Sequence, residues 1–132
     1  MKWIQISLLA VFSLAGLQAD EVTHSFLGVG KANRTVIVGE NGEVKWRVDL
    51  PASDGWVLPS GNVLLAVYPN AEFPKGGVVE VDRDTKEYVF SYQGQQNEIS
   101  SVQALNDGTF LVAELGPTPR AIVLNQIGRA HV

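Results

Sequence analysis

A short hairpin that occurs twice is the feature that most limits how this chain can fold. Residues 55–66 read Gly-Trp-Val-Leu-Pro-Ser-Gly-Asn-Val-Leu-Leu-Ala, and residues 102–113 read Val-Gln-Ala-Leu-Asn-Asp-Gly-Thr-Phe-Leu-Val-Ala. Each copy has an apolar strand, a tight turn that ends in glycine, and a second apolar strand, which is typical of a β-hairpin. The turn glycines, Gly61 and Gly108, lie 47 residues apart. A repeat of this length made only of strands predicts one architecture, the four-stranded blade of a β-propeller.

Further strand patterns fill the chain after residue 20, where helical periodicity is absent. The polar segment 49–54 is expected to be a connector, and a loop that contains prolines follows each hairpin. Asn41-Gly42 adds a third hairpin signal near the start. The predicted strands are 25–30, 34–38, 43–48, 55–58, 62–68, 77–81, 87–92, 99–105, 109–114 and 120–124.

Along the chain, these predicted strands fall into a group of three, a group of four and a group of three. This grouping predicts an all-β fold, a partial β-propeller of about two and a half four-stranded antiparallel blades after an N-terminal signal helix. Strand ends recur at Gly39, Asp82 and Asn125, in steps of 43 residues. Because a propeller needs at least about four blades, we expect residues 20–126 to be an incomplete set. Residues 127–132 resemble a translated sequencing adapter; the alternative is a true C-terminus on a small open stack of sheets.

Residues 1–19 are predicted to be a secretory signal peptide. Lys2 gives a positive start, residues 4–16 are mostly apolar, and Ala19 provides a small residue before the polar Asp20. The apolar run is too short to span a bilayer core of about 30 Å as a helix. We therefore expect a secreted or periplasmic protein with no membrane span after cleavage of the leader. A buried N-terminal helix and an uncleaved anchor are the alternatives.

Composition excludes several classes of function. The chain has no cysteine, which removes disulfides, thiolate metal sites and a cysteine nucleophile. Its net charge is −4 and it has no run of Lys or Arg, which argues against nucleic acid as a partner. Asp82 and Asp84 lack the glycine and the final glutamate of a calcium loop, so a turn is favoured over a metal site. We predict no catalytic residue, no metal ligand and no identifiable cofactor.

Two segments resemble the blade signature of PQQ-like, or quinoprotein-type, β-propellers; they are residues 36–46 and 80–90. That signature has an aspartate, a Thr-Gly turn and a tryptophan that docks one blade on the next. Asp82 and Thr85 match it, whereas Lys86 replaces the glycine and Phe90 the tryptophan. In the first segment Trp46 matches, and a glycine stands where the aspartate is usual. The resemblance implies that Trp46 and Phe90 pack between blades, with ligand stacking as the alternative.

The resemblance covers about residues 24–125 and implies a fold more than an activity. Nothing matches the quinone-binding or calcium-binding residues of quinoprotein dehydrogenases, and their vicinal cysteine pair is impossible in this chain. Arylsulfotransferase-like propellers share the Leu-Pro-x-Gly-Asn hairpin seen at residues 58–62, but their histidine-based chemistry has no match in this stretch.

The candidate ligand-binding residues lie on or near the predicted inner strands. Asp54 and Trp56 share one face of a strand by alternation, and Gln103 is the repeat equivalent of Trp56. A carboxylate, an indole and an amide near a channel mouth suit a polar ligand such as a carbohydrate. A core tryptophan and a turn-capping aspartate are the alternative. Glu114 is the fourth candidate; it either faces a ligand or pairs with Arg120 across the proline loop.

These patterns predict an exported PQQ-like β-propeller protein that acts as a ligand-binding or scaffold module and is present as a truncated fragment. One alternative is an exported enzyme whose active site lies mostly in the missing blades, and another is a module that binds a protein. Inward-facing His, Arg or acidic clusters in later blades would favour the enzyme. We also expect the isolated piece to be poorly soluble or oligomeric, because its end blades lack partners.

Overall fold

The computed structural model describes residues 23–126 and the backbone of residues 130 and 131. The predicted signal peptide, residues 1–19, lies outside them, as do residues 127–129 and 132 of the predicted adapter. The described part is all-β and contains no helix, and hence no helix that could cross a membrane. Its strands are β1 (Phe26–Gly28), β2 (Thr35–Val38), β3 (Val44–Val48), β4 (Ala52–Val57), β5 (Val63–Val67), β6 (Gly77–Val81), β7 (Tyr88–Gln93), β8 (Glu98–Ala104), β9 (Phe110–Leu115), β10 (Arg120–Leu124) and β11 (Ala130–His131).

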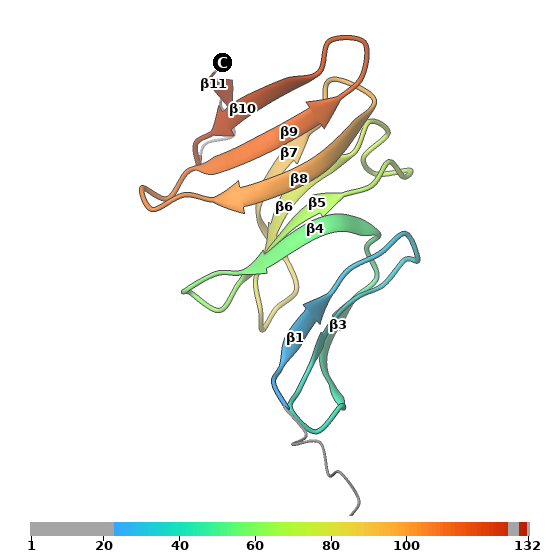
Figure 1. The fold of residues 1–132 in the computed structure, drawn as a ribbon, viewed down its shortest axis with the longest axis vertical. Helices are drawn as coiled ribbons and strands as arrows, with labels where there is room; N and C mark the ends of the chain where they lie inside the picture. Colours follow the sequence, from blue (N-terminus) through green and yellow to red (C-terminus); the bar gives the residue numbers. More distant parts are fainter. Residues whose placement is uncertain (1–22, 127–129, 132) are drawn as a thin grey trace, which may run out of the picture.

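The strands form three small antiparallel sheets that stack along the long axis of the molecule (Figure 1). The first sheet has the order β1-β2-β3, the second β4-β5-β6-β7, and the third β8-β9-β10-β11. Neighbouring strands in each sheet are neighbours in sequence, so every connection within a sheet is a hairpin. The third sheet has a fourth strand, β11, which pairs with Val123 and Leu124 over two residues. The sequence did not predict this strand.

The start of β4 differs from the prediction. Residues 52–54 were expected to belong to a connector, but β4 begins at Ala52 and includes the polar residues Ser53 and Asp54. The register against β5 shifts between Ala52 and Asp54, and a matching shift occurs between Ile99 and Ser101 of β8. The same irregularity therefore recurs one repeat later, at the start of each four-stranded sheet.

The pairing registers show that β1, β5 and β9 are equivalent strands, as are β2, β6 and β10. In each sheet, the first residue of β1, β5 or β9 is apolar and pairs with the last residue of β2, β6 or β10. The three pairs are Phe26 with Val38, Val63 with Val81, and Phe110 with Leu124. Among residues 23–126, the first sheet thus has no strand equivalent to β4 or β8.

The core consists of two apolar layers, one on each side of the second sheet. All five residues of β5 are buried, and alternate residues point to opposite layers. Leu64 and Ala66 pack against the third sheet, while Val63, Leu65 and Val67 pack against the first. This continuous apolar strand is what a sheet covered on both faces requires.

Trp46 and Phe90 both lie in these layers between sheets. Trp46 of β3 is buried against the second sheet, and its Nε1 donates to the Arg83 carbonyl at 2.9 Å. Phe90 of β7 is buried against the third sheet, where its ring meets Phe110 edge-on with centroids 5.3 Å apart. Each ring therefore lies at the contact between one sheet and the next, and neither is open to a ligand.

Candidate functional site

Three side chains of β4 hydrogen-bond to the backbone of β8. Ser53 Oγ donates to the Ile99 carbonyl at 3.0 Å, and Trp56 Nε1 donates to the Val102 carbonyl at 2.6 Å. The Val102 amide in turn donates to Asp54 Oδ2 at 3.1 Å. The partners lie 46 or 48 residues apart, so each bond joins one repeat to the next. Because β8 is an edge strand, these bonds satisfy backbone groups that an open edge leaves exposed.

These bonds hold Asp54 and Trp56 in fixed positions. The second carboxylate oxygen of Asp54 accepts the Gly55 amide at 2.9 Å, so both oxygens have partners in the protein. The indole N–H of Trp56 also has a hydrogen-bond partner in the protein, but 46% of the residue is exposed. The ring of Trp56 is therefore the part of this pair that remains accessible to another molecule.

A hollow of about 320 Å³ opens beside Trp56, and we call it the inner hollow. Its polar lining comes from Asp54, Ser101 and Gln103, and its apolar lining comes from Trp56, Val102 and residues of β9 and β10. The apolar residues include Leu111, Ala113 and Ala121. The structure thus brings together three of the four predicted ligand-binding residues, namely Asp54, Trp56 and Gln103.

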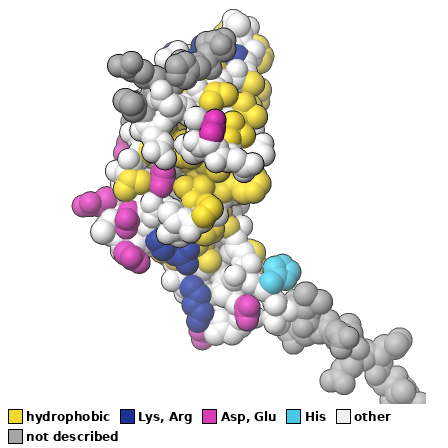
Figure 2. All heavy atoms as spheres, turned by 90° about the vertical axis from the view of Figure 1, so that its left-hand side faces the viewer, with side chains coloured by type: hydrophobic (Ala, Val, Ile, Leu, Met, Phe, Trp, Pro, Cys, Tyr) yellow, Lys and Arg dark blue, Asp and Glu magenta, His cyan; other side chains and the backbone are white. Residues whose placement is uncertain are grey.

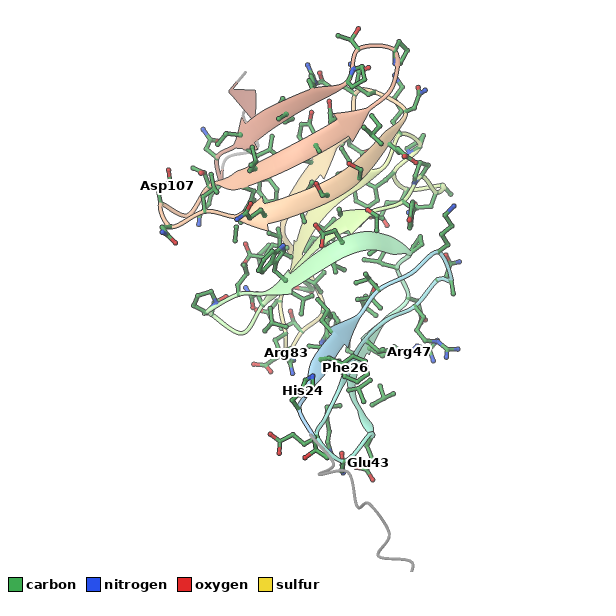
Figure 3. The ribbon with its side chains drawn as sticks, viewed as in Figure 1. His24, Phe26, Glu43, Arg47, Arg83 and Asp107 are labelled. Carbon is green, nitrogen blue, oxygen red and sulfur yellow. The ribbon has the colours of Figure 1, made fainter. Side chains whose placement is uncertain are left out.

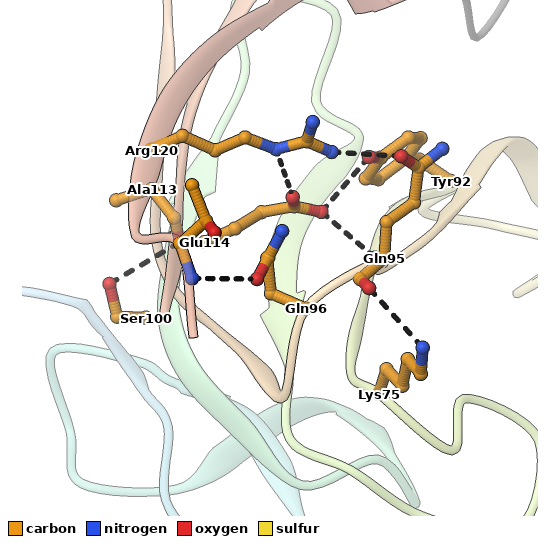
Figure 4. Close-up of polar contacts among 9 residues, drawn as sticks. Lys75, Tyr92, Gln95, Gln96, Ser100, Ala113, Glu114 and Arg120 are labelled. Carbon is orange, nitrogen blue, oxygen red and sulfur yellow. Dashed lines mark hydrogen bonds and ion pairs between the residues drawn. The ribbon is translucent and has the colours of Figure 1, made fainter. Parts of the chain in front are cut away.

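Glu114, the fourth predicted residue, lies elsewhere, at the loop end of β9 (Figure 4). Its side chain is fully buried, and protein groups occupy both carboxylate oxygens. Oε1 accepts the Tyr92 hydroxyl at 2.9 Å and the Gln95 amide at 3.1 Å, and Oε2 accepts Arg120 Nε at 2.7 Å. The pairing with Arg120, one of the two alternatives from the sequence, is present.

The buried carboxylate changes the acidity of its partners. Burial, followed by the hydrogen bond to Glu114, raises the pKa of Tyr92 to about 12. The same carboxylate raises the pKa of Arg120, mainly through their side-chain hydrogen bond. Arg120 also donates to Gln95 Oε1 at 2.9 Å. Sequence analysis missed Tyr92 and Gln95 as partners, because nothing local marks a contact between residues about 20 positions apart.

Asp82 and Asp84 belong to a turn. Asp82 Oδ1 accepts the amides of Asp84 at 3.0 Å and Thr85 at 2.8 Å, and these bonds lower the Asp82 pKa. Lys86 closes the turn with a positive φ of 63°. Within the described part, no group of three or more His, Asp or Glu side chains is placed to hold a metal ion.

A second hollow, of about 490 Å³, lies between the two glycine-containing turns. Pro59 and Ser60 line it on one side and Asn106 on the other, and Glu80 contributes a carboxylate. Asn62 Nδ2 donates to that carboxylate at 2.7 Å. The sequence did not predict this hollow, because it depends on how two hairpins pack side by side.

Hydrophobic side chains gather over the upper and middle parts of the face shown in Figure 2, with acidic side chains scattered among them.

No family model matches the chain, and no curated protein does. Solved structures do match, among them a protein of unknown function from Bacteroides caccae with a TM-score of 0.66 and 18% sequence identity. The match covers 83% of this chain but only 39% of that one. At this identity the likeness establishes the shared fold and nothing about activity.

Proposed function

We propose that the chain is an exported module of the PQQ-like β-propeller type and that it works by binding or as a scaffold. In this proposal the three sheets are consecutive blades, and a ring of at least about four is completed by further blades. The hydrogen bonds that join β4 to β8, one repeat later, support this proposal, and so does the packing of Trp46 against the second sheet. The left-handed backbone conformation of Lys86 also supports the resemblance, because the blade signature has a glycine at this position.

The observation that carries the binding function is the open ring of Trp56 beside the inner hollow. Aromatic side chains offer a flat apolar surface for stacking, and Ser101 and Gln103 add polar groups at the same hollow. A small, partly apolar site with a few polar groups is typical of small-molecule binding. We propose a carbohydrate as the ligand class, stacked on Trp56 and hydrogen-bonded by Gln103.

Tryptophan fluorescence tests this proposal directly. Glucose, galactose and N-acetylglucosamine are titrated separately into the purified chain, and at least one is expected to shift the emission in a saturable way. Trp56→Ala is expected to abolish the binding, which isothermal calorimetry measures without relying on the indole. Val57→Ala is the matched control, because its side chain is equally exposed and follows Trp56 on the same strand.

Two outcomes would contradict the proposal. One is that none of the saccharides binds the wild-type chain. The other is that Trp56→Ala binds a saccharide as well as Val57→Ala does, which would move the site away from the inner hollow. Circular dichroism of each variant separates a loss of binding from a loss of the fold.

A further inference from the structure

One carboxylate stands in the apolar layer between the second and third sheets. Glu80 of β6 pairs with Leu64 of β5 and with Phe90 of β7, and paired residues of neighbouring strands point to the same face of a sheet. Leu64 and Phe90 belong to the layer that packs against the third sheet. Glu80 therefore points to the third sheet as well, and it is half-buried there.

The equivalent positions of the other two sheets are apolar. By register, Ile37 of β2 and Val123 of β10 stand where β6 has Glu80. Ile37 is buried in the layer between the first and second sheets. The contact between sheets thus forms without a carboxylate at this position, and removing a charged group from water costs free energy unless it has a partner. Glu80 is therefore a candidate for binding and not for packing.

The carboxylate of Glu80 opens into the hollow of about 490 Å³ between the two glycine-containing turns, which we call the turn hollow. The turn between β8 and β9, where Figure 3 labels Asp107, projects on the same side of the molecule as the turn between β4 and β5. The lining residues come from the second and third sheets and their turns, so the hollow needs no further blade to form. Its apolar lining includes Leu58, Leu105 and Phe110.

Glu80 is the one charged residue among the described residues that line the turn hollow. Asn62 Nδ2 donates to its Oε1 at 2.7 Å. Asn62 is itself held in place, because its amide donates to Ser60 Oγ at 3.2 Å and its Oδ1 accepts the Arg83 amide at 3.3 Å. The carboxylate is thus fixed through one oxygen, and the described part provides no partner for the other, Oε2.

These features select the chemistry of a ligand. The negative charge of Glu80 disfavours an anion, and a calcium or magnesium ion needs more oxygen ligands than one carboxylate supplies. A primary ammonium group, in contrast, needs one carboxylate oxygen to form a charge-assisted hydrogen bond. An apolar body attached to that group fits the remaining lining, because small-molecule sites combine apolar walls with a few polar groups.

We infer that the turn hollow binds a small organic ammonium ion, with the ammonium group on Glu80 Oε2 and the hydrocarbon part against Leu58 and Phe110. This site is separate from the proposed carbohydrate site. Ala104 lines the turn hollow, whereas Gln103, on the opposite face of β8, lines the inner hollow. The two hollows share no lining residue, so either site can exist without the other.

Isothermal calorimetry with n-hexylammonium at neutral pH tests the inference, and n-hexanol is the uncharged counterpart of this probe. The wild-type chain is expected to bind hexylammonium saturably and hexanol at least about tenfold more weakly, because the alcohol lacks the charge. Glu80→Gln keeps the shape of the side chain and an acceptor for Asn62. It is expected to weaken the binding of hexylammonium by at least about tenfold.

Glu87→Gln is the matched control, because it removes the same charge from an exposed position that does not line the turn hollow. It is expected to bind hexylammonium like the wild type. Ala104→Leu is a second variant, which fills the hollow without changing its charge and is expected to lose binding. Circular dichroism shows whether each variant folds. Backbone amide chemical shifts locate the ion, and Asn106 and Gly108 are expected to move on addition of hexylammonium.

An Nα-acetyl-lysine amide carries the same ammonium group as a lysine side chain and distinguishes a peptide from a free amine. Hexylammonium is expected to bind more tightly, because its whole body is apolar. Tighter binding of the lysine derivative would overturn the assignment to a small amine.

Three further results would overturn the inference. They are a wild-type chain that does not bind hexylammonium, equal affinities for hexylammonium and hexanol, and equal losses in Glu80→Gln and Glu87→Gln, which would mean that overall charge attracts the ion. Saccharide binding is expected to be unchanged in Glu80→Gln, because Glu80 does not line the inner hollow. Failure of one proposal therefore leaves the other open to its own test.

Discussion

At the residue scale, the clearest departure from ordinary backbone geometry is Lys86. It is the one described residue other than glycine with a positive φ, at 63°. Its amide donates to the Asp82 carbonyl at 3.0 Å, which closes the turn before β7. A side chain in this left-handed region costs about 1–2 kcal/mol. In the blade signature that this segment resembles, glycine stands at this position, and the backbone shows that Lys86 adopts a left-handed conformation there.

Replacing this lysine by glycine is therefore expected to stabilise the fold. Glycine removes the steric cost but increases the entropy of the unfolded chain, so Lys86→Gly is expected to raise the free energy of unfolding by about 0.5–1 kcal/mol. Glu87→Gly is the control, because its φ is not positive, and it is expected to be neutral or destabilising. Urea denaturation measures both; a Lys86→Gly variant less stable than wild type would contradict the account of this turn.

The buried hydroxyl of Tyr92 predicts a loss of stability in alkali. Its pKa is about 12 in the folded chain and about 10 when unfolded, so the folded state holds this proton more tightly. The resulting stability is fully present below pH 10 and is lost as the pH rises through 12. Tyr92→Phe removes this dependence and is expected to flatten the slope of unfolding free energy against pH in that window. Equal slopes for the variant and the wild type would show that Tyr92 is not held by Glu114.

At the element scale, the hairpins could be predicted, but the hydrogen bonds that join β4 to β8 could not. Gly61 and Gly108 both have a positive φ, and this local turn chemistry is visible in the sequence. Ser53 and Asp54 look like loop residues, because polar side chains next to a proline are typical of connectors. Their partners lie on β8, some 46 to 48 residues away, and local patterns carry no signal for contacts at that distance.

Asp54 is expected to stabilise the contact between β4 and β8. Asp54→Ala leaves the Val102 amide without its acceptor, and we expect a loss of about 1–3 kcal/mol in the free energy of unfolding. Ser101→Ala is the control, because Ser101 is the exposed repeat equivalent of Asp54 and is expected to change stability by less than about 0.5 kcal/mol. Thermal and urea unfolding of both variants measure the difference. Equal effects would mean that the hydrogen bond contributes nothing beyond the strand itself.

At the scale of the whole molecule, three sheets are joined by two apolar layers and by polar contacts between neighbouring sheets. The repeat predicted three groups of strands in this order, because strand ends recur at Gly39, Asp82 and Asn125 in steps of 43 residues. The pairing of Glu114 with Arg120 was one of the alternatives from the sequence, but the contacts of Glu114 with Tyr92 and Gln95 were not predicted, and neither was the short β11 of the third sheet. Those features depend on contacts between elements, which a linear pattern does not encode.

The central claim is that side chains of β4 lock the second sheet to the edge of the third. Amide hydrogen exchange at Val102 tests it most directly, with Val79 of the central strand β6 as an internal reference. The account predicts slow exchange at Val102 in the wild type, fast exchange at Val102 in Asp54→Ala, and slow exchange at Val79 in both. Fast exchange at Val102 in the wild-type chain would contradict it, because the edge of β8 would then be open to water.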